Sequence, residues 1–306
     1  MRALVTGGAG FIGSHMVDEL VSAGMEVHVL DNLSTGSKGN VNPKAIFHLA
    51  DIREEVVQSL LKEIRPDVVF HMAAQVDVQR SVKKPQEDAS INLVGTVNLL
   101  EACRQAEVRK IIYSSSCAVY GNTVKERMEE VDPAVPISYY GISKWMPEHY
   151  LRIYQQLYGL SYTILRYANV YGPRQTPKGE GGVVAIFLDR IRKGQPLVIY
   201  GDGKQTRDFV FVKDVVRANM EATFKGDGQL IHISTSNKST VSELFGHLEL
   251  IHGKSITVTH AEERPGDIRH SCLSNQKALE VFGWKPDYNL WTGLKESYAY
   301  TINGEQ

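Results

Sequence analysis

Residues 3–13 read Ala3-Leu4-Val5-Thr6-Gly7-Gly8-Ala9-Gly10-Phe11-Ile12-Gly13, and a helical pattern of apolar residues follows them. A short apolar strand, a glycine-rich turn and a helix in this order are typical of a dinucleotide-binding site. Gly7 permits the tight turn, Gly10 lets the backbone approach a pyrophosphate, and Gly13 lets helix and strand pack closely. The N–H groups at the helix N-terminus then face the phosphates, so this turn, with Phe11 and Ile12, is the predicted cofactor site.

A carboxylate follows the second predicted strand. Val27-His28-Val29-Leu30 ends at Asp31, eighteen residues after Gly13. An acid at that place accepts hydrogen bonds from an adenosine ribose and repels a 2′-phosphate. The sequence therefore favours NAD over NADP.

Apolar strands alternate with helical patterns through the first half of the chain. Strands are expected at 27–30, 45–49, 67–71 and 110–113, and helices around 56–64 and 91–106. This alternation predicts a parallel, doubly wound sheet of the α/β class, in which ligands bind beyond the carboxyl ends of the strands. Ala73, Ala74 and Ser114 follow two of these strands, and such small residues leave room for a flat cofactor ring.

Tyr140 and Lys144 lie four positions apart, which places both side chains on one face of a helix. A free phenol has a pKa of about 10, and an ammonium group one turn away, with a cationic cofactor nearby, favours its ionised form. The pair can therefore supply a general base. Pro147, which costs about 3 kcal/mol in a helix interior, predicts either a kink or a helix with a single turn before it.

Bulk properties agree with an enzyme of this kind. The chain has 306 residues, of which 42% are hydrophobic and 23% charged, and its net charge is −1. Because there is no basic run and no long apolar segment, we expect neither a nucleic-acid partner nor a membrane span, and no signal peptide. Three widely spaced cysteines suggest reduced thiols in the cytoplasm, and ten scattered histidines suggest no metal site.

Loop-rich segments that carry arginines begin after Arg166. Asn169 opens the first, Arg207 lies in the next, and Arg264-Pro265-Gly266-Asp267 comes later. Guanidinium groups offer paired donors to phosphate oxygens, which suits a diphosphate. We expect a dinucleotide-binding domain of residues 1–167 with a return of about 210–237, and an interleaved substrate lobe of residues 168–209 and 238–306.

Together these motifs resemble the extended short-chain dehydrogenases/reductases, which have a Rossmann-type fold. The resemblance rests on residues 6–13, Asp31-Asn32, Asp51-Ile52, the serines at 114–116 with Val119-Tyr120-Gly121, and Tyr140 with Lys144. Asn169, Arg207-Asp208 and the segment 264–267 narrow it to nucleotide-sugar enzymes, most closely the UDP-glucose 4-epimerases. It runs from residue 1 to about residue 290.

The resemblance implies a role for each of these residues. Tyr140 would be the base, Lys144 would hold the nicotinamide ribose and lower the pKa of Tyr140, and Ser116 would bind the sugar O4. The residues implied to lie near NAD are Asn32, Asp51, Ile52 and Asn92. Those implied to lie around the UDP group are Asn169, Arg207, Arg264 and Asp267. Many of these epimerases carry a cofactor-contacting lysine where this chain has Val76, so that contact is expected to be absent or supplied elsewhere. A homodimer through two long helices is also implied.

The implied reaction is NAD-dependent 4-epimerisation of a UDP-hexose. Hydride would pass from C4 of the sugar to tightly bound NAD and return to the opposite face of a 4-keto intermediate. Related dehydratases carry an acid just after the serine or threonine, where this chain has Cys117-Ala118, so return of hydride is the simpler interpretation. Cys117 fits a small buried residue better than the reactive cysteine of epimerase-reductases.

The substrate and the class of function stay open. Ser271 lies where the resembling enzymes limit bulk at C2 of the sugar, and its small size predicts turnover of UDP-GlcNAc and UDP-GalNAc beside UDP-glucose and UDP-galactose. A UDP-glucuronate 4-epimerase, or another oxidoreductase or dehydratase of the family, is one alternative. The other is an inactive NAD- or nucleotide-sugar-binding regulator, against which intact Tyr140, Lys144 and Ser116 argue.

Overall fold

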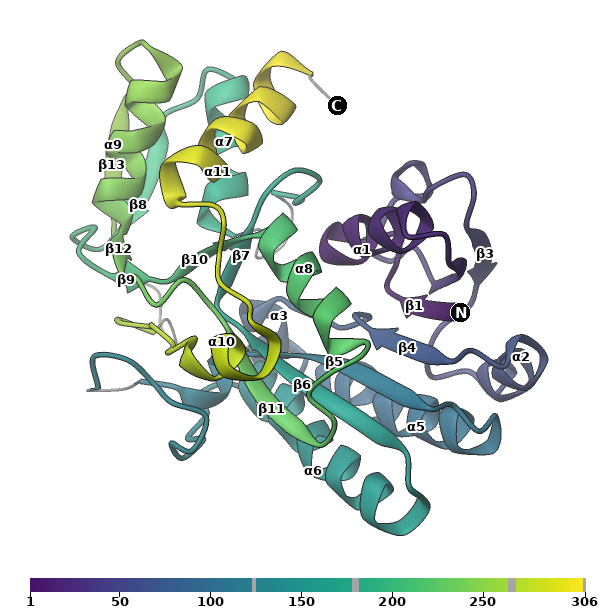
Figure 1. The fold of residues 1–306 in the computed structure, drawn as a ribbon. Helices are drawn as coiled ribbons and strands as arrows, with labels where there is room; N and C mark the ends of the chain where they lie inside the picture. The colour runs from purple at the N-terminus through teal and green to yellow at the C-terminus, as the bar shows by residue number, and fades with distance from the viewer. Residues whose placement is uncertain (123–124, 178–181, 264–267, 305–306) are drawn as a thin grey trace.

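A parallel sheet forms the centre of the molecule (Figure 1). The computed structural model describes residues 1–122, 125–177, 182–263 and 268–304. The seven strands of the sheet, in spatial order, are β11 (Gln229–Ile233), β6 (Ser161–Tyr167), β5 (Lys110–Ser116), β4 (Val68–His71), β1 (Arg2–Thr6), β2 (Glu26–Asp31) and β3 (Ile46–Leu49). Every neighbouring pair is parallel, and the strand order reverses between β1 and β4. The predicted doubly wound sheet is therefore confirmed.

Helices cover both faces of this sheet. On one face α1 (Phe11–Ser22) packs on α8 (Val212–Ala222), and on the other α5 (Gly95–Gln105) packs on α2 (Val56–Ile64) and α6 (Tyr139–Tyr158). Strand β1 shows how the sequence produces these layers. Ala3 and Val5 belong to the apolar cluster of the first face and Leu4 to that of the second, because successive strand residues point to opposite faces. A central strand covered on both faces is therefore apolar throughout.

Helix α6 runs from Tyr139 to Tyr158 through Pro147. The Ser138 side chain caps its start by accepting a hydrogen bond from the N–H of Gly141, and Gly159 ends it with a φ of +74°. Eight residues precede the proline, so the prediction of a single turn before Pro147 is wrong. Tyr140 and Lys144 therefore lie on one continuous helix.

The segment between β4 and α5 is more divided than the sequence predicts. In place of one helix around 91–106, the chain forms α3 (Val78–Lys83), α4 (Pro85–Ala89) and a π-helical turn, η2 (Ser90–Val94), before α5. A π-helical turn shifts the residues that follow it around the helix axis, and such turns are frequent at functional sites.

The second half of the chain adds short strand pairs. These are β7 (Asn169–Tyr171) with β10 (Phe209–Phe211), β9 (Thr206–Arg207) with β12 (Ser239–Thr240), and β8 (Leu197–Tyr200) with β13 (Val258–Ala261). The other elements are α7 (Val183–Arg192), α9 (Val241–His252), α10 (Gln276–Phe282), α11 (Leu290–Tyr298), η1 (Lys38–Asn40), η3 (Cys117–Tyr120) and η4 (Ala299–Asn303). A third apolar cluster, with Phe187, Leu197 and Leu244 at full burial, packs these strands against α7, α9 and α11. None of the helices in the described ranges has the length and apolar character needed to cross a membrane.

Candidate active site

The glycine-rich turn between β1 and α1 packs against the segment that follows β4. Gly7 has a φ of +72°, and a Cβ on it would lie 2.6 Å from the backbone nitrogen of Ala73. A Cβ on Gly13 would lie 2.2 Å from the carbonyl oxygen of Gly7. Gly10 occupies the N-cap of α1, where its lack of a side chain leaves the first N–H groups of the helix to an external acceptor. The turn therefore fits the pyrophosphate of a dinucleotide.

Asp31 ends β2 beside this turn and is almost fully buried. Its carboxylate accepts hydrogen bonds from the N–H of Ala9 at 3.0 Å and of Leu33 at 2.8 Å. The first bond ties the acid to the glycine-rich turn itself, so Asp31 and the turn are held together.

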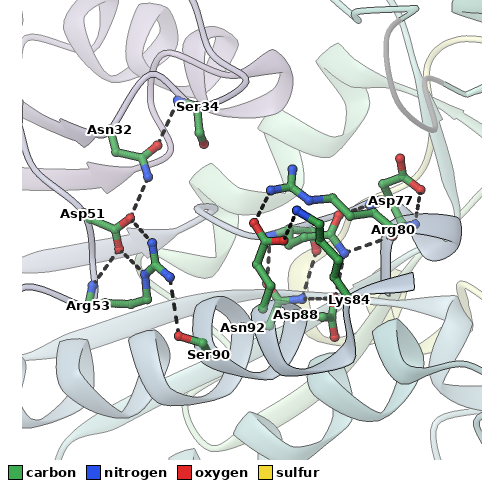
Figure 2. A network of polar contacts seen from close by, with 12 residues as sticks. Asn32, Ser34, Asp51, Arg53, Asp77, Arg80, Lys84, Asp88, Ser90 and Asn92 are labelled. Atoms are coloured by element: carbon green, nitrogen blue, oxygen red, sulfur yellow. Dashed lines mark hydrogen bonds and ion pairs between the residues drawn. The ribbon is translucent and has the colours of Figure 1, made fainter. Parts of the chain in front are cut away.

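Asp51 follows β3 and lies close to Asn32 (Figure 2). The Asn32 amide donates to the Asp51 carboxylate at 2.7 Å, and Nε and Nη2 of Arg53 donate to it at 2.8 Å each. The hydrogen bonds from Arg53 are the largest cause that lowers the pKa of Asp51 to about 2. Ile52, which lies between Asp51 and Arg53 in the sequence, is buried. These residues form one polar edge beyond β2 and β3, where an adenosine would lie.

A cavity of about 510 Å³ opens beyond the carboxyl ends of β5 and β6. The predicted site residues that line it are Phe11, Ile12, Ser116, Tyr140, Asn169, Arg207 and Ser271. Apolar residues that the sequence reasoning missed, such as Val183, Phe187 and Phe209, line its far end, and a helical core pattern would not distinguish them from ordinary core. Among the described residues that line the cavity, none is an aspartate or a glutamate.

Tyr140 reaches this cavity because the first turn of α6 packs closely on its neighbours. Its backbone N–H donates to the Ser81 hydroxyl of α3 at 3.2 Å. A Cβ on Gly141 would lie 2.7 Å from the carbonyl oxygen of Ala118, so glycine lets α6 approach the turn that carries Ser116 and Cys117. The phenol and the serine hydroxyl thereby line the same cavity.

Lys144, one turn after Tyr140 on α6, is not among the described residues that line the cavity, and 4% of its surface is exposed. Its Nζ is 4.7 Å from the centroid of the Tyr113 ring, and the Tyr113 hydroxyl donates to the Lys144 carbonyl at 3.1 Å. Burial lowers the pKa of Lys144 to about 8, and the nearby carboxylates of Glu148 and Asp88 oppose that shift. The side chain is therefore a buried cation at neutral pH.

The three serines at the end of β5 have different partners. The Ser114 hydroxyl lies 3.1 Å from the Tyr167 hydroxyl, and the Ser115 hydroxyl donates to Glu148 at 2.6 Å. The Ser116 hydroxyl accepts the N–H of Ala118 at 3.2 Å and lines the cavity. Ser115 also lines the cavity, but its hydroxyl, like that of Ser114, is tied to a buried partner, so Ser116 is the serine best placed to meet a substrate.

A buried ion pair under the serines was missed by the sequence reasoning. Arg166 donates through Nε and Nη2 to Glu148 at 2.9 and 2.6 Å, and through Nη1 to the Tyr120 hydroxyl at 2.6 Å. That hydroxyl also lies 2.6 Å from Nε2 of His232. Glu148 stands one turn after Lys144 on α6, and this spacing was the signal that could have indicated it.

Asn92 of the π-helical turn holds the segment after β4, which carries Ala73 and Ala74. Its amide accepts from the Gln75 N–H at 2.8 Å and donates to the Gln75 carbonyl at 2.9 Å and to the Ser143 hydroxyl at 3.0 Å. Asn92 is buried and does not line the cavity. It therefore connects the cofactor-side segment to the helix of Tyr140.

Ser271 and Cys117 both line the cavity. Ser271 is buried and its N–H donates to the Thr206 carbonyl at 3.2 Å, beside Arg207. Burial raises the pKa of the Cys117 thiol, with an opposing hydrogen bond from Ser271, so the side chain is a neutral thiol. Val76, on the cavity rim, is exposed. The predicted Arg264 and Asp267 lie outside the described residues.

In the described part of the chain, no group of three or more histidine, cysteine, aspartate or glutamate side chains is arranged to hold a metal ion. The polar groups of the site are therefore the tyrosine, the lysine, hydroxyls, amides and arginines named above.

Comparisons with known proteins agree with this geometry. Residues 3–233 match the model of the NAD dependent epimerase/dehydratase family. The chain is 42% identical over 313 residues to the UDP-glucose 4-epimerase of Mycolicibacterium smegmatis, with full coverage of both chains. Among solved structures it is similar to the UDP-glucose 4-epimerase of Thermotoga maritima with UDP-glucose (46% identity, TM-score 0.97, 99% of each chain).

Two further structures extend the comparison. One is the UDP-glucose 4-epimerase of Thermus thermophilus in complex with NAD, with 44% identity, a TM-score of 0.96 and full coverage of both chains. The other is a UDP-N-acetylglucosamine 4-epimerase from Methanobrevibacter ruminantium, with 34% identity, a TM-score of 0.94 and 99% coverage of each chain. Relatives of this fold therefore differ in the sugar that their names report.

Proposed function

The chain belongs to the NAD-dependent epimerase/dehydratase family, and from that premise we propose that it interconverts UDP-glucose and UDP-galactose by NAD-dependent 4-epimerisation. One observation carries the proposal most directly. Tyr140, Ser116 and Arg207 line one cavity, and no described lining residue is a carboxylate that would serve an elimination. The names of the similar epimerases support the same substrate class.

The residues of the site divide the work of the reaction. The glycine-rich turn would hold the pyrophosphate of NAD, and Asp31, Asn32 and Asp51 would hold its adenosine, so that bound NAD would supply the hydride acceptor and donor. Tyr140 takes the proton of the sugar 4-hydroxyl, and Ser116 holds that oxygen by a hydrogen bond. Lys144, a buried cation one turn away, favours the phenolate form of Tyr140 and binds the nicotinamide ribose.

The second half of the reaction requires space in the cavity for the sugar to rotate. A 4-keto sugar would have to turn over before hydride could return to its other face, and Arg207 and Asn169, which line the cavity, would keep the diphosphate anchored meanwhile. Ser116, Cys117, Ala118 and Ser271 make a small-residue wall at this end of the cavity. This wall gives the ring space to rotate.

Turnover of UDP-galactose tests the proposal directly. Purified protein is incubated with UDP-galactose, the products are identified, and absorbance near 340 nm follows transient reduction of bound NAD. We expect Tyr140→Phe to abolish turnover and to leave UDP-galactose binding nearly intact. The neighbouring Tyr139→Phe, which alters an exposed phenol on the same turn, serves as control and keeps activity. Activity in Tyr140→Phe would remove Tyr140 from the mechanism.

We further propose that UDP-GlcNAc and UDP-GalNAc are substrates. Ser271 lines the cavity with a small side chain, which leaves room for an acetamido group at C2. A relative named as a UDP-N-acetylglucosamine 4-epimerase supports this breadth. Good turnover of UDP-galactose without turnover of UDP-GalNAc would contradict it.

We also propose that the chain divides into a cofactor domain (1–167 with about 210–237) and a substrate lobe (168–209 and 238–306). We further propose that the protein is a homodimer and that it lies in the cytoplasm. Exposed apolar residues on α6, among them Ile153, Leu157 and Tyr158, support a helical interface, and the free cysteines support a reducing compartment. Light scattering of the wild type and of Leu157→Glu tests the dimer, since a charge there should shift the mass to that of a monomer.

A further inference from the structure

Two adjacent acids on α4, Glu87 and Asp88, have different surroundings, and Asp88 lies beside Asn92 (Figure 2). The side chain of Glu87 is 31% exposed and pairs with Arg80 and Lys84 at the surface. Asp88 is 1% exposed and faces inward. Burial of a carboxylate is costly unless its charge is balanced, so the inward position of Asp88 calls for an explanation.

The immediate partners of Asp88 are neutral. Its Oδ1 accepts from the Gln75 amide at 2.7 Å and from the Asn92 amide at 3.3 Å. Its Oδ2 is buried and meets no hydrogen-bond donor in the described ranges. These contacts orient the carboxylate but supply no positive charge.

A chain of hydrogen bonds leads from Asp88 to the helix of Tyr140. The Asn92 nitrogen that donates to Asp88 also donates to the Ser143 hydroxyl at 3.0 Å. That hydroxyl donates in turn to the Tyr140 carbonyl at 3.1 Å. The same nitrogen also donates to the Gln75 carbonyl at 2.9 Å, so Asp88 and Gln75 together orient the Asn92 side chain that contacts the turn between Tyr140 and Lys144.

Lys144 is the buried cation on that turn. The charged or titratable groups that interact with Lys144 are Glu148 on α6, Asp88 on α4 and His71 on β4, and its Nζ lies 4.7 Å from the centroid of the Tyr113 ring on β5. Glu148 shares its charge with Arg166 through two hydrogen bonds, so this pair presents little net charge to a neighbour. Among the described residues no arginine or lysine donates to Asp88, so its charge is the one left to balance Lys144.

We propose that Asp88 is a positioning residue of the reaction, which holds the first turns of α6 through Asn92 and Ser143 and acts as the buried counter-charge of Lys144. The proposal rests on the proposed function, because Lys144 matters through Tyr140 and the cofactor ribose. It assigns Asp88 no contact with substrate or cofactor.

Asp88→Asn tests the charge, with Glu87→Gln as the matched control on the same helix. The lysines are labelled with ¹³C at Cε, the Lys144 resonance is assigned with Lys144→Met, and its titration is followed by NMR in the whole protein. Loss of a close opposite charge should lower the Lys144 midpoint by one pH unit or more in Asp88→Asn, a tenfold or larger loss of affinity for the proton. Glu87→Gln should keep the wild-type midpoint.

Ser143→Ala tests the hydrogen-bond chain without a change of charge. It also keeps the proposal testable if Asp88→Asn does not fold. It should lower kcat for UDP-galactose by about tenfold with little change in KM and none in the Lys144 midpoint. Equal midpoints in Asp88→Asn and Glu87→Gln, or a Ser143→Ala enzyme with wild-type kcat, would overturn the proposal. A wild-type protein that does not convert UDP-galactose would refute the proposed function, whereas the NMR titration would still test the role of Asp88.

Discussion

At Ser271 a single side chain determines how much room the cavity leaves beside Arg207. The residue is buried and lines the cavity, so a larger side chain has no route to solvent and must project into the cavity. We expect Ser271→Tyr to lower kcat/KM for UDP-GalNAc at least a hundredfold and that for UDP-galactose by less than tenfold, because steric exclusion acts on the acetamido group. Ser271→Ala, measured in the same assay, should keep both activities. Equal losses for the two sugars would contradict this role.

The glycine-rich turn allows a second test at a single residue. Gly7 and Gly24 share a positive φ, but a Cβ on Gly24 would meet nothing within 4 Å, whereas one on Gly7 would collide with the backbone at Ala73. Gly24→Ala should cost about 1 kcal/mol of unfolding free energy from the backbone conformation alone. Gly7→Ala should cost clearly more and should yield protein without NAD, as measured by denaturant unfolding and by cofactor content after purification. A Gly7→Ala protein with full NAD content would refute the close-approach argument.

Between elements, the ion pair of Glu148 and Arg166 joins α6 to β6. Both side chains are almost fully buried, so Arg166→Met should cost about 3–5 kcal/mol because it leaves an unpaired buried carboxylate. The double variant Arg166→Met/Glu148→Leu should regain part of that loss. Arg192→Met, which removes one of the two exposed partners of Asp189 on α7 and leaves Lys193, is the control and should cost less than about 1 kcal/mol. Denaturant unfolding measures all of these, and equal costs at Arg166 and Arg192 would contradict the assignment.

Elements near the N-terminus were the easiest to predict from sequence. The strand, turn and helix at 2–22 have a residue pattern whose local chemistry permits few conformations, and the alternating strands imply the sheet. Pro147 was harder, because local propensity predicts a break and the packing of α6 on both neighbouring layers overrides it. The π-helical turn at Ser90–Val94 was also missed, because a single turn of this kind leaves no pattern of apolar residues that would distinguish it from an α-helix.

The site could be predicted where chemistry depends on spacing and not where it depends on distant contacts. Tyr140 and Lys144 are one helical turn apart, and this spacing is visible in the sequence. Arg166, Tyr120 and His232 meet only because β6, η3 and β11 end at the same place in the fold. No local sequence pattern predicts that these three side chains are in contact. The roles assigned to Arg264 and Asp267 remain predictions.

At the scale of the whole molecule, buried histidines link stability to pH. Burial lowers the pKa of His71 and His232 to about 3 each, while an unfolded histidine titrates near 6.5. Below pH 6.5 the unfolded chain therefore binds protons that the folded chain excludes, so each histidine lowers the unfolding free energy by about 1.4 kcal/mol per pH unit as the pH falls. Asp208, whose pKa burial raises to about 6, acts with the opposite sign over part of this range.

The difference in unfolding free energy between the wild type and a histidine variant isolates the contribution of that histidine. We expect the stability advantage of the wild type over His232→Gln to shrink by about 1.4 kcal/mol for each pH unit between 6 and 4, as measured by urea unfolding. His71→Gln should behave in the same way. A difference that stays constant with pH would show that the buried histidine bears a proton in the folded state.

The return of the chain to the sheet has a consequence for any attempt to shorten it. Strand β11 pairs with β6, and α8 covers one face, although both lie after β7 to β10 in sequence. A fragment that stops at Tyr167 would keep the glycine-rich turn, Tyr140 and Lys144, but it would expose the unpaired edge of β6 and the apolar surface beneath α8. Exposed edges of this kind recruit strands from other chains. Such a fragment should aggregate and not act as a free-standing NAD carrier, so a minimal version of this protein would have to retain residues to Ile233 at least.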